Sequence, residues 1–396
     1  MAGRRRAWRS AVAGLCLLFV PLAGCGGRPT ADTARTEVQQ VLDRRAAALL
    51  GHDETAYGRT GTRAPYENVR SVPLASWRYR LTGLHRDGSA ATADAELSYR
   101  VGGYDRAPVT AARTLGLSRT ADGHWYVASD RPAKKADELL WDQGEVTAVK
   151  GEHSLILGVG QTGNTLRGYT ALADRAVPAV SQAWGTDWAR RVVVLVPDSL
   201  EDMAGLLGSP ASSYRGIAAV TTGEAGGSGR APADRIVVNP EAYALLGATG
   251  RQVVLTHEAT HVATRADTTA ATPLWLSEGY ADWIGYLGTG RTAVQAAPEL
   301  ARAVQEGKVP QQLPPDRAFG FSGEATRLAQ AYESGWLACR MIADHWGEVR
   351  LGEFYRAVGE HGKRAGAVEE ALRKVLGTTP EEFTERWRDY LSAQLD

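Results

Sequence analysis

The residues best suited to chemistry are His257, Glu258 and His261, which form a His-Glu-x-x-His pattern. Residues i and i+4 share one face of a helix, so both imidazoles can reach one metal ion. Glu258 then lies where it can take a proton from water at that ion. We therefore expect a helix over residues 251–264 that carries half of a hydrolytic metal site. The alternative is a partly buried helix whose histidines are satisfied by hydrogen bonds alone.

A second motif, Trp-Leu-Ser-Glu-Gly-Tyr-Ala-Asp at residues 275–282, offers a further ligand. Catalytic zinc takes three protein ligands and keeps a fourth position for water, and two histidines with one carboxylate form such a set. Glu278 is the candidate third ligand on a second helix, and Gly279 would let the two helices approach closely. Asp282 lies one helical turn further on, where it can accept a hydrogen bond from the outer nitrogen of a ligand histidine. In the alternative reading, Glu278 is an exposed helix carboxylate.

The two motifs, with 16 residues between His261 and Glu278, resemble those of the gluzincin metallopeptidases, the peptidase MA superfamily. The resemblance covers residues 144–396. It implies a small sheet followed by a mostly helical remainder, one zinc ion per chain, and a peptide or protein substrate. In that family the metal is held by the residues that match His257, His261 and Glu278, and the residue that matches Glu258 is the general base.

Two weaker matches extend the resemblance. Tyr332 begins a Tyr-Glu-Ser-Gly segment similar to the family's Tyr-Glu-Lys-Gly, whose tyrosine donates a hydrogen bond to the tetrahedral intermediate. Residues 234–240 look like the edge strand that borders the family's cleft. Ser334 replaces the family's lysine, and no Gly-x-Met-Glu-Asn segment is found to hold a free amino terminus. These departures argue against aminopeptidase specificity and leave an endopeptidase or a narrowly targeted peptidase as the alternative. Tyr332 has the alternative role of a core aromatic residue.

Composition restricts the other classes of function. The 396 residues include 45 basic and 45 acidic side chains, which argues against a basic nucleic-acid-binding protein. Only three cysteines occur, and Cys339 alone lies outside the N-terminal 25 residues. A disulfide framework within the mature chain is therefore excluded, and Cys339 is expected to be a buried apolar residue.

The N-terminus predicts export. Four arginines within the first nine residues precede an apolar run over residues 11–22 that is too short to span a membrane. The run ends in Leu-Ala-Gly-Cys, which resembles a bacterial lipobox with Cys25 as the lipidated residue. We expect a signal peptide over residues 1–24, a lipidated tether over residues 25–30, and attachment to the extracytoplasmic face of the cell membrane. The alternative is an ordinary secretory signal.

Residues 31–130 predict a separate accessory domain. A helix-like segment at residues 33–50 is followed by four strand-like segments, at residues 77–84, 90–101, 109–118 and 124–128. This layout resembles the nuclear transport factor 2-like cone fold. Residues 131–143 are expected to be a linker or connecting helix.

The expected fold class is therefore α+β with two domains. The leading functional hypothesis is a lipid-anchored zinc metallopeptidase. The competing hypothesis is a non-catalytic lipoprotein that uses a peptidase-like scaffold to bind peptide or cell wall.

Overall fold

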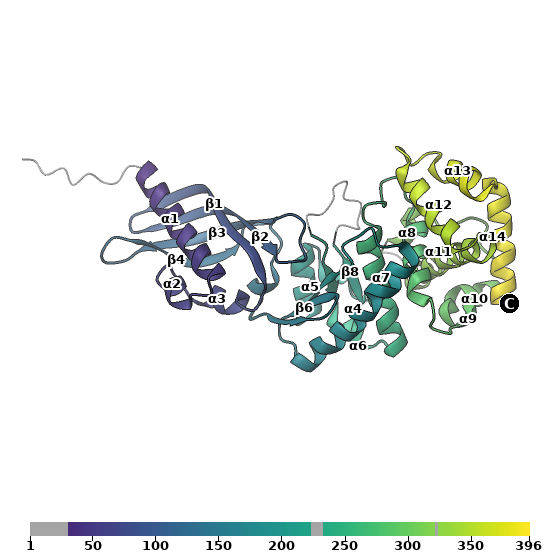
Figure 1. Ribbon diagram of the computed structural model, residues 1–396, viewed down its shortest axis with the longest axis horizontal. Helices are drawn as coiled ribbons and strands as arrows, with labels where there is room; N and C mark the ends of the chain where they lie inside the picture. Colours follow the sequence, from purple (N-terminus) through teal and green to yellow (C-terminus); the bar gives the residue numbers. More distant parts are fainter. Residues whose placement is uncertain (1–30, 223–232, 321–323) are drawn as a thin grey trace, which may run out of the picture.

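The computed structural model describes residues 31–222, 233–320 and 324–396, and the chain has the expected α+β fold. Three parts follow one another along the long axis of the molecule (Figure 1). A helix-covered antiparallel sheet lies at the N-terminal end, a second sheet lies in the middle, and a helical part lies at the C-terminal end. Residues 1–30, which contain the predicted signal and Cys25, lie outside the described residues.

The N-terminal sheet is a four-stranded antiparallel meander in the order β1-β2-β3-β4. Buried and exposed side chains alternate along its strands, because one face is covered by α1 and the other faces solvent. The elements are α1 (Ala31–Leu50), α2 (Glu54–Gly58), α3 (Ala64–Val69), β1 (Leu74–Asp87), β2 (Ala90–Val101), β3 (Val109–Arg119) and β4 (Trp125–Pro132). This is the predicted layout of one long helix and four strands, while the likeness to the cone fold stays a prediction.

The segment between the two sheets is packed. Arg113 of β3 contacts Asp130 at 2.8 Å and Asp142 at 2.7 Å, and the Arg113 side chain is only 3% exposed. Asp142 ends a short 3-10 helix (Leu140–Asp142) whose Trp141 is buried. The predicted linker at residues 131–143 is therefore fastened to the N-terminal sheet by a buried ion-pair cluster.

The second sheet has five strands in the order β5-β6-β7-β9-β8. The three central strands are parallel, and the two outer strands are antiparallel to their neighbours. Helix α4 (Gly163–Trp184) connects β6 to β7, and α5 (Leu200–Leu207), capped by Ser199, follows β7. The strands are β5 (Thr147–Lys150), β6 (Ser154–Gly158), β7 (Val192–Val196), β8 (Ala219–Thr221) and β9 (Ile236–Val238).

This order corrects one expectation. Residues 234–240 were expected to form the edge strand, but β9 lies between β7 and β8. The edge strand is β8, which has only three residues. Strand β8 comes before β9 in the sequence, but β9 lies next to β7 and β8 lies outside it.

Both faces of the second sheet are buried. Ile156, Val194 and Ile236 pack against the helical part, whereas Leu155, Leu157 and Val193 pack with the core of the N-terminal part. Parallel strands buried on both faces form continuous apolar runs, as in the Val-Val-Val-Leu-Val of β7. The second sheet therefore joins the N-terminal part to the helical part.

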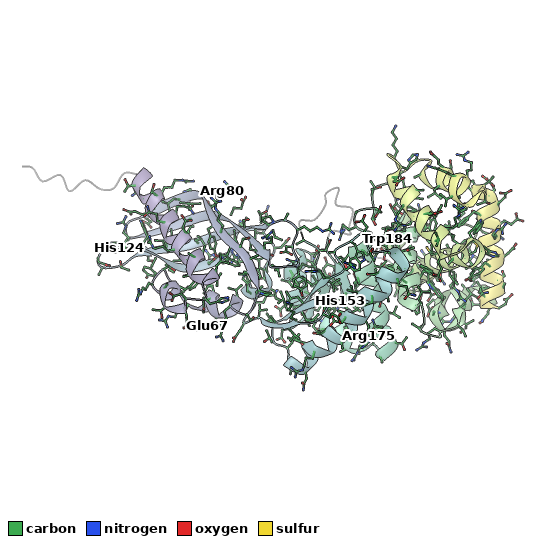
Figure 2. The ribbon with its side chains drawn as sticks, in the orientation of Figure 1. Glu67, Arg80, His124, His153, Arg175 and Trp184 are labelled. Atoms are coloured by element: carbon green, nitrogen blue, oxygen red, sulfur yellow. The ribbon has the colours of Figure 1, made fainter. Side chains whose placement is uncertain are left out.

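The helical part surrounds α7 and α8. Trp184, labelled in Figure 2, lies at the end of α4, where its ring meets those of Tyr280 and Tyr355 at 5.4 and 5.3 Å. Cys339 is fully buried, as expected. The helices are α6 (Pro240–Ala244), α7 (Ala248–Thr264), α8 (Leu274–Tyr286), α9 (Ala293–Ala296), α10 (Pro298–Gln305), α11 (Ala325–Trp346), α12 (Glu348–Glu360), α13 (Ala367–Ala371) and α14 (Pro380–Leu395).

Among the residues that the structure describes, none of the helices combines the length and the apolar character needed to cross a membrane.

Candidate metal centre

Helix α7 carries the His-Glu-x-x-His pattern. It begins at Ala248, three residues before the predicted start, and ends at Thr264 as predicted. The helical repeat brings His257 and His261 onto one face, with their Nε2 atoms 2.9 Å apart and their ring centroids 4.6 Å apart. The Nε2 atoms of His257 and His261 therefore converge on one point.

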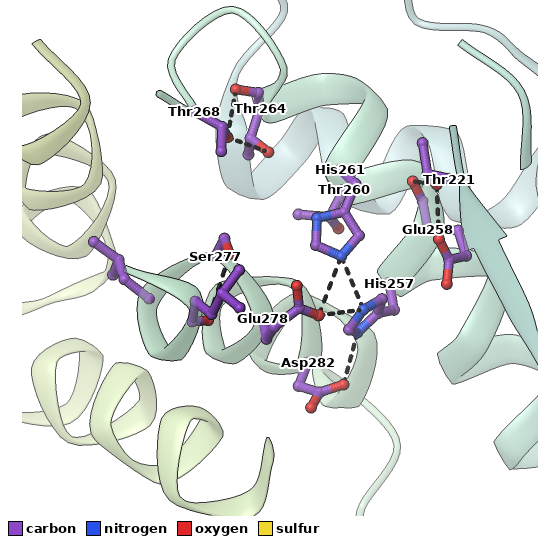
Figure 3. Close-up of polar contacts among 12 residues, drawn as sticks. Thr221, His257, Glu258, Thr260, His261, Thr264, Thr268, Ser277, Glu278 and Asp282 are labelled. Atoms are coloured by element: carbon purple, nitrogen blue, oxygen red, sulfur yellow. Dashed lines mark hydrogen bonds and ion pairs between the residues drawn. The ribbon is translucent and has the colours of Figure 1, made fainter. Parts of the chain in front are cut away.

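Helix α8 brings Glu278 to the same place (Figure 3). The Glu278 Oε2 atom lies 3.2 Å from His257 Nε2 and 3.5 Å from His261 Nε2. The helix starts at Leu274, whose backbone N–H donates to Asp316 Oδ1 at 3.0 Å. Asp316 thus satisfies one of the free amides at the start of α8 and helps to fix the helix that presents Glu278.

The three atoms fit a zinc ion. Four ligands at about 2.0–2.1 Å in a tetrahedron stand roughly 3.3 Å from one another. The separations between His257 Nε2, His261 Nε2 and Glu278 Oε2 are 2.9, 3.2 and 3.5 Å. The three side chains are between 5% and 12% exposed, so the site is largely buried. The donor set and its spacing are therefore compatible with a metal ion that keeps one position for water.

Asp282 contacts the outer nitrogen of His257. Its Oδ1 atom lies 2.8 Å from His257 Nδ1, as Figure 3 shows. Because a carboxylate only accepts, the proton on Nδ1 points at Asp282, and Nε2 is the nitrogen that faces Glu278 and His261. The structure thus places Asp282 where the sequence predicted it, one turn beyond Glu278 on α8.

The close packing of these groups shifts the pKa values of His257 and Glu278. Burial alone would lower the pKa of His257, but the charge and hydrogen bonds of Asp282 and Glu278 outweigh it and raise the pKa to about 10. Burial would raise the pKa of Glu278, but the facing imidazoles of His261 and His257 hold it well below its usual value. The Glu278 carboxylate therefore lies charged against a protonated imidazole, and a metal ion that binds here would take the place of that proton.

Glu258 is buried on the strand side of α7. The Thr221 hydroxyl of β8 donates to Glu258 Oε2 at 2.7 Å, and the residue is 5% exposed. Figure 3 shows the carboxylate beside His257, facing β8 rather than α8. The Glu258 carboxylate is therefore not one of the three converging ligand groups, and its bond to Thr221 holds it on the side of α7 that faces β8.

Tyr332 borders the site from α11. Its ring centroid lies 6.4 Å from that of His257 and 5.2 Å from that of Phe319. Both predicted roles remain compatible with this position, because the ring packs against an aromatic neighbour and also faces a ligand histidine. The role of its hydroxyl as an oxyanion donor stays a prediction.

The glycine next to Glu278 serves a different contact from the expected one. A Cβ atom on Gly279 would lie 2.2 Å from the backbone oxygen of Gly335 on α11. The close approach between α8 and α7 occurs instead at Gly285, where a Cβ would lie 3.2 Å from Val253. Gly279 therefore brings α8 against α11, the helix that carries Tyr332, and not against α7 as expected.

Sequence reasoning missed Thr221 and Asp316. A run of β-branched residues around Thr221 could have indicated a short strand. No local signal shows that its hydroxyl meets Glu258, which lies 37 positions further along the chain. Asp316 likewise lies 42 positions after the helix start that it caps.

Comparisons with known proteins give only a weak likeness. No protein-family model and no curated protein matches the chain. A mutant M1 zinc metallopeptidase from Deinococcus radiodurans is 18% identical, with 82% of this chain and 62% of that chain covered and a TM-score of 0.37. A mutant two-domain M1 zinc metallopeptidase bound to L-arginine is 14% identical, with 81% and 94% covered and a TM-score of 0.38. The chain spans less than two thirds of the first of these proteins, and similarity at this level does not establish a shared family.

Proposed function

We propose that this protein is a lipid-anchored zinc metallopeptidase that hydrolyses peptide bonds outside the cell membrane. The observation that carries the proposal is the convergence of His257, His261 and Glu278, whose ligand atoms lie 2.9 to 3.5 Å apart. A fourth residue, Glu258, stands beside them with a buried carboxylate that does not join the ligand set. Three ligands and a separate base are what a metal-dependent hydrolase needs.

In this proposal the three converging side chains hold one zinc ion. Zinc supplies Lewis acidity when bound, which polarises a peptide carbonyl and makes water acidic. Asp282 keeps His257 in the tautomer that leaves Nε2 free to bind.

The proton transfers belong to Glu258. Its carboxylate accepts a proton from the attacking water and delivers that proton to the leaving amine. Tyr332, beside His257, is the candidate donor to the developing oxyanion. Removal of one such donor lowers kcat by about 100- to 1,000-fold in comparable sites.

Substitution of the base tests the proposal. Glu258→Gln should bind one zinc ion per chain like the wild type and lose cleavage of a peptide library by at least about 100-fold. His261→Ala should lose both metal and cleavage. A wild-type chain that binds no zinc, or a Glu258→Gln variant that cleaves as fast as the wild type, would contradict the proposal. Zinc binding without any cleavage would instead favour the non-catalytic peptide- or wall-binding function.

The membrane anchor is a separate part of the proposal, and it is supported by the apolar run and the Leu-Ala-Gly-Cys segment that ends at Cys25. Cells that express the full chain should incorporate a labelled fatty acid into it and retain it in the membrane fraction. Cys25→Ser should lose the label and release the protein or block its processing. Label retained by Cys25→Ser would show that the anchor lies elsewhere.

A further inference from the structure

The carboxylate of Glu258 has a specific partner on the edge strand. The Thr221 hydroxyl donates to Glu258 Oε2 at 2.7 Å and also lies 3.1 Å from the Glu258 backbone oxygen. Thr221 is fully buried and Glu258 is 5% exposed. A hydrogen bond to a charged acceptor in such a dry place is stronger than an ordinary one and restricts the rotation of the carboxylate.

The edge strand that carries Thr221 is short, and its neighbour β9 contributes to its position. Strand β8 has three residues and pairs with β9, with Thr221 opposite Ile236. The pairing is extended by two bonds, from Thr222 N to the Arg235 backbone oxygen at 2.8 Å and from Arg235 N to Thr222 Oγ1 at 3.0 Å. The location of Thr221 therefore depends in part on Arg235, the residue before β9. Arg265, which follows α7, contributes as well, because its guanidinium donates to the Thr222 backbone oxygen and contacts Asp234 Oδ1 at 2.8 Å.

Arg235 is held from the N-terminal part of the chain. Its guanidinium forms a two-pronged contact with Asp105, with Nη1 2.7 Å from Oδ1 and Nη2 2.9 Å from Oδ2. The Asp105 side chain is fully buried and the Arg235 side chain is 10% exposed. Asp105 Oδ2 also accepts from Val101 N, the last residue of β2, at 2.7 Å. The pair thus ties the end of the N-terminal sheet to the start of β9.

The two contacts lie on opposite faces of the second sheet. Thr221 and Ile236 face the helices, and Ile236 packs in the same core as α7. Arg235 turns toward the N-terminal part, where it meets Asp105. The sheet therefore connects the N-terminal part to the side of α7 that carries Glu258.

We propose that Thr221 is a positioning residue for Glu258, and that the Asp105–Arg235 ion pair lets the N-terminal part hold the strands on which Thr221 depends. This inference rests on the proposed function, because it assigns a partner to the general base. The N-terminal part is then a component of the peptidase site and not a spacer.

The first experiment removes the hydroxyl and keeps the shape of the side chain. Thr221→Val should lower kcat by about 10- to 100-fold, because a base that has lost this hydrogen bond spends less time in the productive geometry. KM and zinc content should stay within about twofold of the wild type, since the hydrogen bonds of the Thr221 hydroxyl run to Glu258. Thr221→Ser, which retains the hydroxyl, should restore kcat to within about threefold of the wild type.

A matched control separates positioning from stability. Thr60→Val also removes a buried hydroxyl that bonds a charged side chain, in this case Arg45 at 3.2 Å, but it lies in the N-terminal part away from α7. This variant should lower the melting temperature about as much as Thr221→Val and leave kcat unchanged. If Thr221→Val keeps the kcat of an active wild type, or if Thr221→Ser is as slow as Thr221→Val, the positioning role is wrong and the proposed function stands. A wild type without hydrolysis overturns both.

The second experiment tests the ion pair by a double-mutant cycle. Asp105→Asn should lower kcat by about three- to tenfold, and its combination with Thr221→Val should be no slower than Thr221→Val alone. An unchanged kcat for Asp105→Asn, or effects that multiply in the combined variant, would overturn the role of the ion pair. Should Asp105→Asn fail to fold, the Asp105→Asn and Arg235→Gln pair takes its place in the cycle, because it leaves no buried charge unpaired.

Discussion

His257 Nδ1 and Asp282 Oδ1 lie 2.8 Å apart, across the contact between α7 and α8. The contact fixes the orientation of the candidate ligand imidazole from the helix that also presents Glu278. Loss of such a carboxylate typically weakens metal binding by about 10- to 100-fold. Asp282→Asn should therefore raise the zinc dissociation constant by that factor in a competition titration with a chromogenic chelator. Asp389→Asn, at an exposed carboxylate of α14, is the control and should bind zinc like the wild type. An unchanged affinity for Asp282→Asn would show that Asp282 does not support the ligand.

Removal of the metal should destabilise the folded chain. A ligand that binds only the folded state stabilises it by about 2.7 kcal/mol at 100 times its dissociation constant. For a domain of this size each kcal/mol shifts the melting temperature by about 2–4 °C. A strong chelator should therefore lower the melting temperature of the zinc-loaded protein by roughly 5–10 °C in scanning calorimetry. The chelator should have no such effect on His261→Ala, which lacks one ligand. Equal shifts in both proteins would mean that the chelator acts elsewhere.

The contact of Gly279 with α11 predicts that alanine at this glycine and alanine at Gly168 change the stability of the protein in opposite directions. Gly279→Ala would place a Cβ atom 2.2 Å from the Gly335 backbone oxygen and force α8 and α11 apart. It should lower the free energy of unfolding by about 1–3 kcal/mol or more, as other overpacked core substitutions do. Gly168→Ala, in α4, meets nothing within 4 Å and should raise that free energy by about 0.5–1 kcal/mol. Urea denaturation measures both, and similar effects at the two positions would contradict the packing argument.

The raised pKa of the buried Glu333 carboxyl predicts that the stability of the folded chain depends on pH. Burial raises its pKa to about 7, although its carboxylate accepts backbone hydrogen bonds from Leu300 and Glu299 at the start of α10. Between its ordinary pKa of 4.5 and about 7, the folded chain keeps a proton here that the unfolded chain has lost. Stability from this group is therefore present at low pH and is lost as the pH rises through that window, by at most about 1.4 kcal/mol per pH unit.

The Glu333→Gln variant has no such proton to lose. Its unfolding free energy should fall less steeply than that of the wild type between pH 5 and about 7. Denaturation curves for both proteins at several pH values measure the difference. Parallel pH profiles would show that the Glu333 carboxyl titrates normally in the folded protein.

Much of the secondary structure was predictable because it depends on local patterns. The sequence shows apolar and polar residues alternating in the N-terminal strands, and it shows an apolar run at β7. The structure has strands at these places. Strands β5 and β8 were not predicted, because segments of four and three residues are too short to show a regular alternation of apolar and polar side chains. Strand order was mispredicted at residues 234–240, since no local pattern indicates which short strand lies at an edge.

The sequence by itself determined the spacing of the candidate centre. A helix of ordinary geometry brings His257 and His261 to one face and Asp282 to the same face as Glu278, because the helical repeat is a property of the backbone and needs no distant contact.

Only the tertiary structure decided which partners these residues have. Thr221 meets Glu258 across 37 positions of the chain, and Asp105 meets Arg235 across 130. Gly279 meets α11 instead of α7. Such contacts are set by how buried sheets and helices fill space together, and the free energy that selects them is shared among many side chains that are far apart in the sequence.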